Sequence, residues 1–143
     1  MTSAPPITLN DGQSIPQLGL GVWQMTDDEA TAAVSHALEA GYRHIDTAAI
    51  YRNELGVGRA IAASSLPRDE IFVTTKLWNK DQGRDLARPG LEQSLEKLGL
   101  DHVDLYLIHW PCPARGTYVE SWEQLIDFRS EGLVRSIGVC NFL

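Results

Sequence analysis

The apolar positions of this chain form short runs that alternate with segments of helical periodicity. The runs are rich in residues that favour β-strands and are bounded by glycine, proline or polar residues, which is typical of buried strands. We expect five such strands, at residues 18–23, 42–46, 71–76, 103–109 and 136–141. Because strands that alternate with helices at this spacing need crossover connections, the sheet is predicted to be parallel.

Between the strands, apolar residues recur at intervals of three and four, as on one face of an α-helix. Thr26 is a credible N-cap for the first helix, and Gly41 closes it. The other helices are predicted at residues 53–63, 89–98 and 121–131. The apolar face of each is expected to comprise Leu55, Ile61 and Ala62 in the second helix, Leu91, Leu95 and Leu98 in the third, and Trp122, Leu125 and Ile126, in register with Arg129, in the fourth.

A hairpin is predicted before the first strand of the sheet, at residues 7–15, around the turn sequence Asn10-Asp11-Gly12. The segment Gly19-Leu-Gly21-Val-Trp-Gln24 lacks the third glycine of a dinucleotide-binding turn, which disfavours a doubly wound sheet. A (β/α)8 barrel fits better, although a complete one takes about 250 residues. We therefore expect residues 1–143 to form a single α/β unit: the hairpin and about half of a (β/α)8 TIM barrel, with strands 1–5 and helices 1–4.

Four of the predicted strands end on a polar side chain. These residues are Asp46, Lys76, His109 and Asn141, separated by 30, 33 and 32 residues, or about one strand–helix unit each. Because the carboxyl ends of parallel strands meet at one rim of a barrel, where such folds place their chemistry, we expect these side chains to gather there.

Composition disfavours several classes of partner. The formal charge of −7 disfavours nucleic acid and anionic membrane surfaces. No apolar run approaches the roughly 20 residues of a membrane-spanning helix, and the N-terminus shows no secretory signal. Cys112 and Cys140 show no metal-ligand spacing, so we expect no metal site and two free thiols in a reducing cytoplasm.

Four segments together resemble the aldo-keto reductases. They are Asp46-Thr-Ala-Ala-Ile-Tyr51-Arg-Asn-Glu54, Thr75-Lys76-Leu-Trp78, Leu107-Ile-His109-Trp-Pro111 and Ser136-Ile-Gly-Val-Cys-Asn141-Phe. They occur in the order and spacing of that family, and the motif content is most similar to its bacterial diketogluconate-reductase-like branch. The resemblance implies a (β/α)8 barrel and NADPH-dependent reduction of aldehydes and ketones.

The same resemblance implies particular site residues. The catalytic tetrad would be Asp46, Tyr51, Lys76 and His109. NADPH would contact Gly21, Val22, Trp23, Asp46, Cys140 and Asn141, of which Asn141 would bind the nicotinamide carboxamide. The family usually has serine where this chain has Cys140, and a thiol is a weaker hydrogen-bonding group than a hydroxyl. The pocket for a small-molecule carbonyl substrate would be lined by Trp23, Trp78, His109 and Trp110.

The chemistry of carbonyl reduction fits those residue types. Hydride delivery to a carbonyl carbon leaves negative charge on its oxygen, so the site needs a proton donor and dipoles aimed at that atom. A phenol such as Tyr51 is a poor donor at neutral pH unless a cation beside it stabilises the phenolate, and Lys76 is the candidate. Asp46 would hold the lysine oriented, and His109 would hydrogen-bond the carbonyl oxygen.

Each of these residues, taken singly, also has an ordinary structural explanation. Asp46 could cap the following helix, Tyr51 could be an amphipathic rim residue, Lys76 could be solvated, and His109 could be a satisfied core histidine. The tryptophans could be ordinary core, which is the expectation for Trp122 on its helix. The joint occurrence of the four residues in those motifs favours an active site.

The expected half-barrel leaves three hypotheses open. The chain could be the N-terminal part of a reductase whose activity belongs to a complete barrel. It could instead be a structural or binding module with little turnover that self-associates through the open edges of its first and fifth strands. A closed dimeric barrel that regained some function ranks lowest, because it would place two tetrads on one rim. The specific substrate stays open among sugar ketones, methylglyoxal-like aldehydes and quinones.

Overall fold

A computed structural model describes residues 4–142 of the chain. Strands β3 (Leu20–Gly21), β4 (His44–Asp46), β5 (Phe72–Leu77), β6 (Val103–Ile108) and β7 (Val134–Val139) form one sheet in that order. All four pairings in the sheet are parallel. The expectation of a five-stranded parallel sheet is therefore confirmed, and β3 and β7 are its edges.

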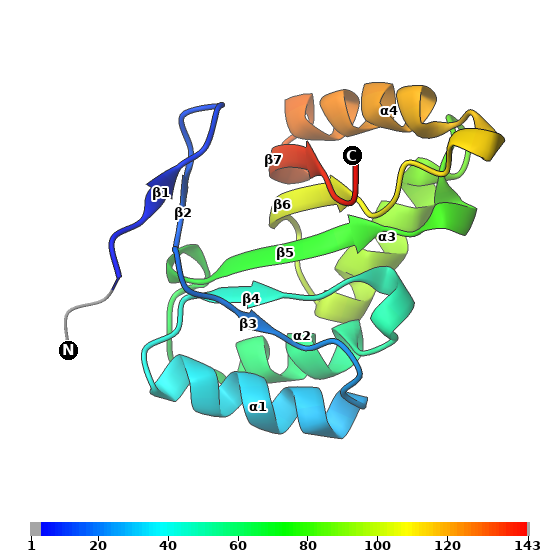
Figure 1. Ribbon diagram of the computed structural model, residues 1–143. Helices are drawn as coiled ribbons and strands as arrows, with labels where there is room; N and C mark the ends of the chain where they lie inside the picture. The colour runs from blue at the N-terminus through cyan, green and yellow to red at the C-terminus, as the bar shows by residue number, and fades with distance from the viewer. Residues whose placement is uncertain (1–3, 143) are drawn as a thin grey trace.

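Helices α1 (Asp27–Glu39), α2 (Glu54–Ala63), α3 (Ala87–Leu98) and α4 (Tyr118–Ser130) connect successive strands. They follow one another around the outside of the curved sheet, and the chain enters from the hairpin β1 (Ile7–Thr8) and β2 (Ser14–Ile15) beside the strands' starting ends (Figure 1). This is the predicted order of one hairpin, five strands and four helices in the part of the chain that the structure describes. Short 3-10 turns lie in the loops: η1 (Ala49–Tyr51), η2 (Arg68–Glu70), η3 (Asn79–Asp81) and η4 (Pro113–Arg115).

Helix α1 begins where the sequence predicts. The Thr26 side chain accepts a hydrogen bond from the Glu29 backbone, and the Glu29 carboxylate accepts one from the Thr26 backbone, which makes a complete capping box. Gly41 follows the helix with a φ of +100°, a conformation that a residue with a Cβ rarely adopts. These local signals explain why the boundaries of α1 were readable from the sequence.

The starts of α3 and α4 differ from expectation. Helix α3 begins at Ala87 rather than Pro89. Proline is tolerated in this first turn because the first four N–H groups of a helix have no partner within it. Helix α4 begins at Tyr118, three residues before the predicted Ser121. A helix start without a side-chain cap, as in both cases, leaves little signal in the sequence.

The apolar faces of α2 and α4 were partly mispredicted. Leu55 and Ile126 are 44% and 49% exposed, and Ala62 is exposed as well, although all three were expected on the apolar faces. The buried face of α2 instead carries small residues, which let the helix approach its neighbours closely. A Cβ on Gly58 would lie 2.5 Å from the Leu98 carbonyl oxygen of α3. The buried residues of α4 are Ser121, Leu125 and Phe128, and Trp122 is only partly buried against the core.

The two faces of the sheet differ in burial. Ile45, Val73 and Leu77 point toward the helices and are at most 1% exposed, together with Tyr106 and Ile108 of β6. The alternate positions point to the opposite face, because successive strand residues alternate in direction. That inner face carries Asp46 and Lys76, which therefore lie across the sheet from the helices.

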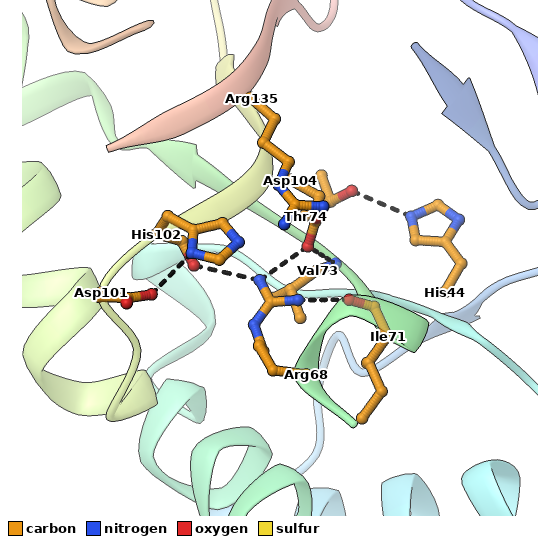
Figure 2. A network of polar contacts seen from close by, with 9 residues as sticks. All are labelled: His44, Arg68, Ile71, Val73, Thr74, Asp101, His102, Asp104 and Arg135. Atoms are coloured by element: carbon orange, nitrogen blue, oxygen red, sulfur yellow. Dashed lines mark hydrogen bonds and ion pairs between the residues drawn. The ribbon is translucent and has the colours of Figure 1, made fainter. Parts of the chain in front are cut away.

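At the starting ends of the strands, a polar network centres on Asp104 (Figure 2). Its carboxylate is 3% exposed and lies 2.7 Å from Arg68 Nη2 and 3.2 Å from Arg135 Nη1. It also accepts a hydrogen bond from the Val73 backbone at 2.9 Å. The network therefore joins η2, β5, β6 and β7 at the end of the sheet opposite to the predicted active-site rim.

Candidate active site

The carboxyl ends of the strands bring three of the predicted residues to one rim. Asp46 is the last residue of β4, Lys76 is the penultimate residue of β5, and His109 directly follows β6. Backbone hydrogen bonds continue the sheet past the strand ends, from His109 N to Leu77 O at 3.2 Å and from Cys140 N to Ile108 O at 2.9 Å. The ladder of backbone hydrogen bonds therefore extends to the residues from which the polar side chains emerge.

Lys76 forms the centre of the rim. Its ammonium Nζ donates to Asp46 Oδ1 at 2.7 Å and to the Thr47 carbonyl oxygen at 2.9 Å. Lys76 is only 5% exposed, whereas about a third of the Asp46 side chain is exposed. A buried cation is tolerated when it is paired and hydrogen-bonded, and these two contacts meet that need.

Tyr51 reaches the same point from the loop after β4. The turn η1 ends at Tyr51, and Arg52 beyond it adopts a left-handed conformation with a φ of +59°. The centroid of the Tyr51 ring lies 5.3 Å from Lys76 Nζ, and 5.8 Å from the ring of His109 in an edge-on arrangement. The structure thus brings Asp46, Tyr51, Lys76 and His109 together within one contact network.

The imidazole of His109 is buried and packs edge-on against Trp78 at 5.3 Å between ring centroids. Burial lowers the pKa of His109, the nearby Lys76 cation lowers it further, and Asp46 opposes the shift. The ring is therefore neutral at neutral pH, with one nitrogen donating and the other accepting. Its Nδ1 is buried without a hydrogen-bond partner among the described residues.

The predicted pocket tryptophans have different surroundings. Trp78 is partly buried against His109, whereas Trp23 and Trp110 are 66% and 45% exposed. Both exposed rings lie on loops that follow strand ends, since Trp23 follows β3 and Trp110 follows β6. Large exposed aromatic side chains at the carboxyl ends of strands are available to contact a ligand.

The predicted cofactor residues lie on both sides of this rim. Gly21 is opposite Asp46 in the β3–β4 register, and the buried Val22 donates its N–H to the Asp46 carbonyl oxygen at 3.2 Å. Asn141 lies two residues beyond β7 with a φ of +61°. Its amide Nδ2 donates to the His109 carbonyl oxygen at 2.8 Å and lies 3.2 Å from Cys140 Sγ. The end of β7 is thereby attached to the loop that carries His109.

The sequence did not indicate three residues whose contacts support the rim. Thr47 supplies a carbonyl oxygen to Lys76, and Asn53 and Gln82 are buried amides that hydrogen-bond to neighbouring loops. Asn53 was interpreted only as the start of a helix, and Gln82 only as part of a polar loop. The backbone carbonyl oxygens to which these two amides donate lie 28 to 31 residues away along the chain, so no local pattern indicates them.

Within residues 4–142, no three or more His, Cys, Asp and Glu side chains gather in a way that could hold a metal ion. No helix in the same range has the length and apolar character needed to cross a membrane.

Comparison with known proteins places these features in a family. Residues 16–143 match the model of the aldo/keto reductase family. The chain is 59% identical over 142 residues to the methylglyoxal reductase DkgA of Yersinia pestis and 55% identical over 142 residues to that of Escherichia coli K12. It covers 99% of its own length in both matches, but 50% and 51% of theirs. The chain thus spans about half the length of these curated relatives.

Solved structures agree with this assignment. A crystal structure of an aldo/keto reductase from Brucella melitensis superposes with a TM-score of 0.95 at 58% identity, covering 99% of this chain and 55% of that one. The Bombyx mori aldo-keto reductase in complex with NADP superposes with a TM-score of 0.88 at 47% identity, covering 97% and 51%. The hairpin, the five parallel strands and the four helices correspond to about half of such structures. The chain belongs to the aldo/keto reductase family.

Proposed function

We propose that this chain carries the catalytic residues for NADPH-dependent reduction of aldehydes and ketones to alcohols. The observation that carries the proposal is the placement of the Tyr51 ring within 5.3 Å of the Lys76 ammonium and 5.8 Å of the His109 ring. A phenol whose ring lies near both a cation and a neutral imidazole is suited to give a proton to a developing alkoxide.

Each of the four residues has a distinct role in this proposal. Tyr51 donates its phenolic proton to the carbonyl oxygen as negative charge develops there. Lys76 stabilises the phenolate that remains, and Asp46 keeps the ammonium in place through their 2.7 Å contact. His109, neutral because burial and Lys76 lower its pKa, hydrogen-bonds the carbonyl oxygen and fixes its direction.

NADPH, when bound, supplies the hydride. Gly21, Val22, Trp23 and Asp46 would hold it on one side of the rim. On the other side, Cys140 and Asn141 would hold the nicotinamide end. Asn141 fits that role because its side chain is exposed at the rim and is aligned by its bond to His109 O. The Bombyx mori relative is described in complex with NADP, which supports this choice of cofactor.

The substrate is proposed to be a small carbonyl compound. Several relatives above 50% identity are named methylglyoxal reductases, and methylglyoxal is therefore the first substrate to test. The apolar faces of Trp23, Trp78 and Trp110 would contact the carbon skeleton while the tetrad engages the oxygen.

Cys112 and Cys140 are free thiols, which supports a reducing, cytoplasmic setting.

The alternative proposal is that residues 1–143 form a single unit that associates with copies of itself. Strands β3 and β7 are the edges of the parallel sheet, and Val139 at the end of β7 is 46% exposed. An uncovered apolar edge favours pairing with another chain. Self-association through these edges, with little or no turnover, is the alternative to catalysis by this chain.

The test is NADPH oxidation by the purified chain with methylglyoxal. Replacing Tyr51 with phenylalanine is expected to lower kcat by at least about a hundredfold, the usual size of a lost proton donor, while the circular dichroism spectrum is unchanged. Tyr42→Phe is the matched control, because Tyr42 is an exposed tyrosine before β4. Equal turnover in Tyr51→Phe and Tyr42→Phe would remove Tyr51 from the mechanism.

A further inference from the structure

Two buried side-chain amides fasten neighbouring loops of the rim. Asn53, which is fully buried, donates from Nδ2 to the carbonyl oxygens of Val22 at 2.7 Å and Met25 at 3.0 Å. Its Oδ1 accepts the hydroxyl of the buried Thr47 at 2.9 Å. The loop that carries Trp23 is therefore held, on both sides of the tryptophan, by the loop that carries Tyr51.

Gln82 makes the same connection on the other side of the rim. It is 1% exposed and donates from Nε2 to the Trp110 carbonyl oxygen at 2.7 Å. Its Oε1 accepts the hydroxyl of Thr117 at 3.3 Å. In both cases an amide donates to the backbone of a tryptophan-bearing loop and accepts a threonine hydroxyl.

The indole rings do not fix these loops by their own burial. Trp23 is 66% exposed and Trp110 is 45% exposed, so neither ring is anchored in the core. The amides, by contrast, are sequestered from water, where a hydrogen bond is strong and an unpaired carbonyl is costly. The two amides therefore hold the backbone from which each ring extends.

We propose that Asn53 and Gln82 are positioning residues that hold Trp23 and Trp110 as opposite walls of the carbonyl pocket. This inference rests on the proposed function for its consequence in catalysis. The ring of an aromatic aldehyde needs both walls, so binding of such a substrate depends strongly on the two amides. Binding of methylglyoxal depends on them less, because it has a single methyl group beside its carbonyls. The amides thus determine preference for substrate size rather than the chemistry at Tyr51.

The first arm of the test does not require turnover. Hydrogen exchange is measured by mass spectrometry on Asn53→Leu, Gln82→Met and the control Gln93→Met, which alters an exposed glutamine of α3. We expect faster exchange at residues 22–26 only in Asn53→Leu and at residues 110–117 only in Gln82→Met. Thr47→Val and Thr117→Val each remove only the hydroxyl that donates to the amide oxygen, and they should give smaller increases in exchange in the same segments. They replace the amide variants in the test if Asn53→Leu or Gln82→Met does not fold. Unchanged exchange in these segments would overturn the proposal.

The second arm compares two substrates in the same variants. For phenylglyoxal, KM is expected to rise about tenfold in Gln82→Met, the effect of roughly one lost hydrogen bond, while kcat for methylglyoxal stays within about twofold. An equal rise in KM for both substrates would contradict a role in specificity. If no variant and no wild-type chain turns over, the proposed function fails, whereas the exchange measurement still decides whether the amides position the loops.

Discussion

At the scale of single residues, the rim combines one buried cation with neutral hydrogen-bonding groups. Lys76 is paired with Asp46 and is close to Tyr51, while His109 is kept neutral by burial and by the same lysine. The lysine thus influences both groups that would contact a carbonyl oxygen. This shared dependence makes Lys76 the residue whose loss should disturb the site most widely.

Replacing Lys76 with methionine should leave the Asp46 carboxylate and the Thr47 carbonyl oxygen without their donor. Because a similar volume is retained, the fold should persist, whereas turnover should fall at least about a hundredfold with the loss of the cation beside the phenol. Steady-state kinetics and thermal unfolding of the variant measure the two effects. The control Lys97→Met alters an exposed lysine of α3 and should change neither. Retained turnover in Lys76→Met would contradict the role of the cation.

The histidines predict a dependence of stability on pH. Burial is the main cause that lowers the pKa of both His44 and His109 below the ordinary histidine value of 6.5. The unfolded chain then binds more protons than the folded one at mildly acidic pH, so the free energy of unfolding is highest above about pH 6.5 and declines as pH falls through the lowered pKa values. Urea unfolding between pH 7.5 and 5.5 measures this slope. His44→Asn should reduce this slope, and an unchanged slope in that variant would refute the assignment.

At the scale of secondary-structure elements, close approach of helices replaces large apolar side chains in part of the core. Gly58 of α2 contacts the last turn of α3, where a Cβ would lie 2.5 Å from Leu98 O. Gly58→Ala is expected to destabilise the fold by about 1–3 kcal/mol, since backbone atoms must shift. Gly21→Ala, where a Cβ meets nothing within 4 Å, should change stability by less than about 0.5 kcal/mol. Chemical denaturation measures the free energy of unfolding of both variants. Equal stability in the two would contradict the close contact of Gly58 with α3.

The Asp104 network fastens the starting ends of three strands. Removing its carboxylate in Asp104→Ala leaves Arg68, Arg135 and the Val73 N–H without their common partner. We expect the free energy of unfolding to fall by about 3 kcal/mol. Asp101→Ala is the control, because the Asp101 side chain is 91% exposed and pairs only with His102 in Figure 2. Equivalent denaturation midpoints for the two variants would show that the network adds little stability.

Sequence periodicity predicted the elements better than it predicted their contacts. The regular return of Asp46, Lys76 and His109 to strand ends follows from one strand–helix unit per step, and the structure places them together for that reason. The face of α2 was mispredicted because its contacts depend on Gly58, and a glycine adds nothing to an apolar pattern. Asn53 and Gln82 were missed because the partners of a buried amide become visible only once distant loops are adjacent.

At the scale of the whole molecule, β3 and β7 are the edges of the parallel sheet among residues 4–142. The alternative to catalysis, self-association through these edges, predicts that analytical ultracentrifugation shows a species at least dimeric. Val139→Lys places a charge on the exposed end of β7 and should shift the distribution toward monomer, because charged residues discourage edge pairing. Val119→Lys, at an exposed site on α4, is the matched control. A cooperatively unfolding monomer in the wild-type chain would exclude this assembly.

The proposed catalysis also depends on the whole molecule, since the proposed cofactor residues lie at the ends of β3 and β7, on opposite edges of the sheet. The most direct measurement follows the hydride itself, with methylglyoxal and NADPH deuterated at the transferable position, and mass spectrometry of the alcohol product. We predict one deuterium per product molecule with the wild-type chain and with Tyr42→Phe, and almost no product with Tyr51→Phe. Absence of labelled alcohol from the wild-type chain, or equal labelling by Tyr51→Phe, would contradict the assignment of reductase chemistry to these residues.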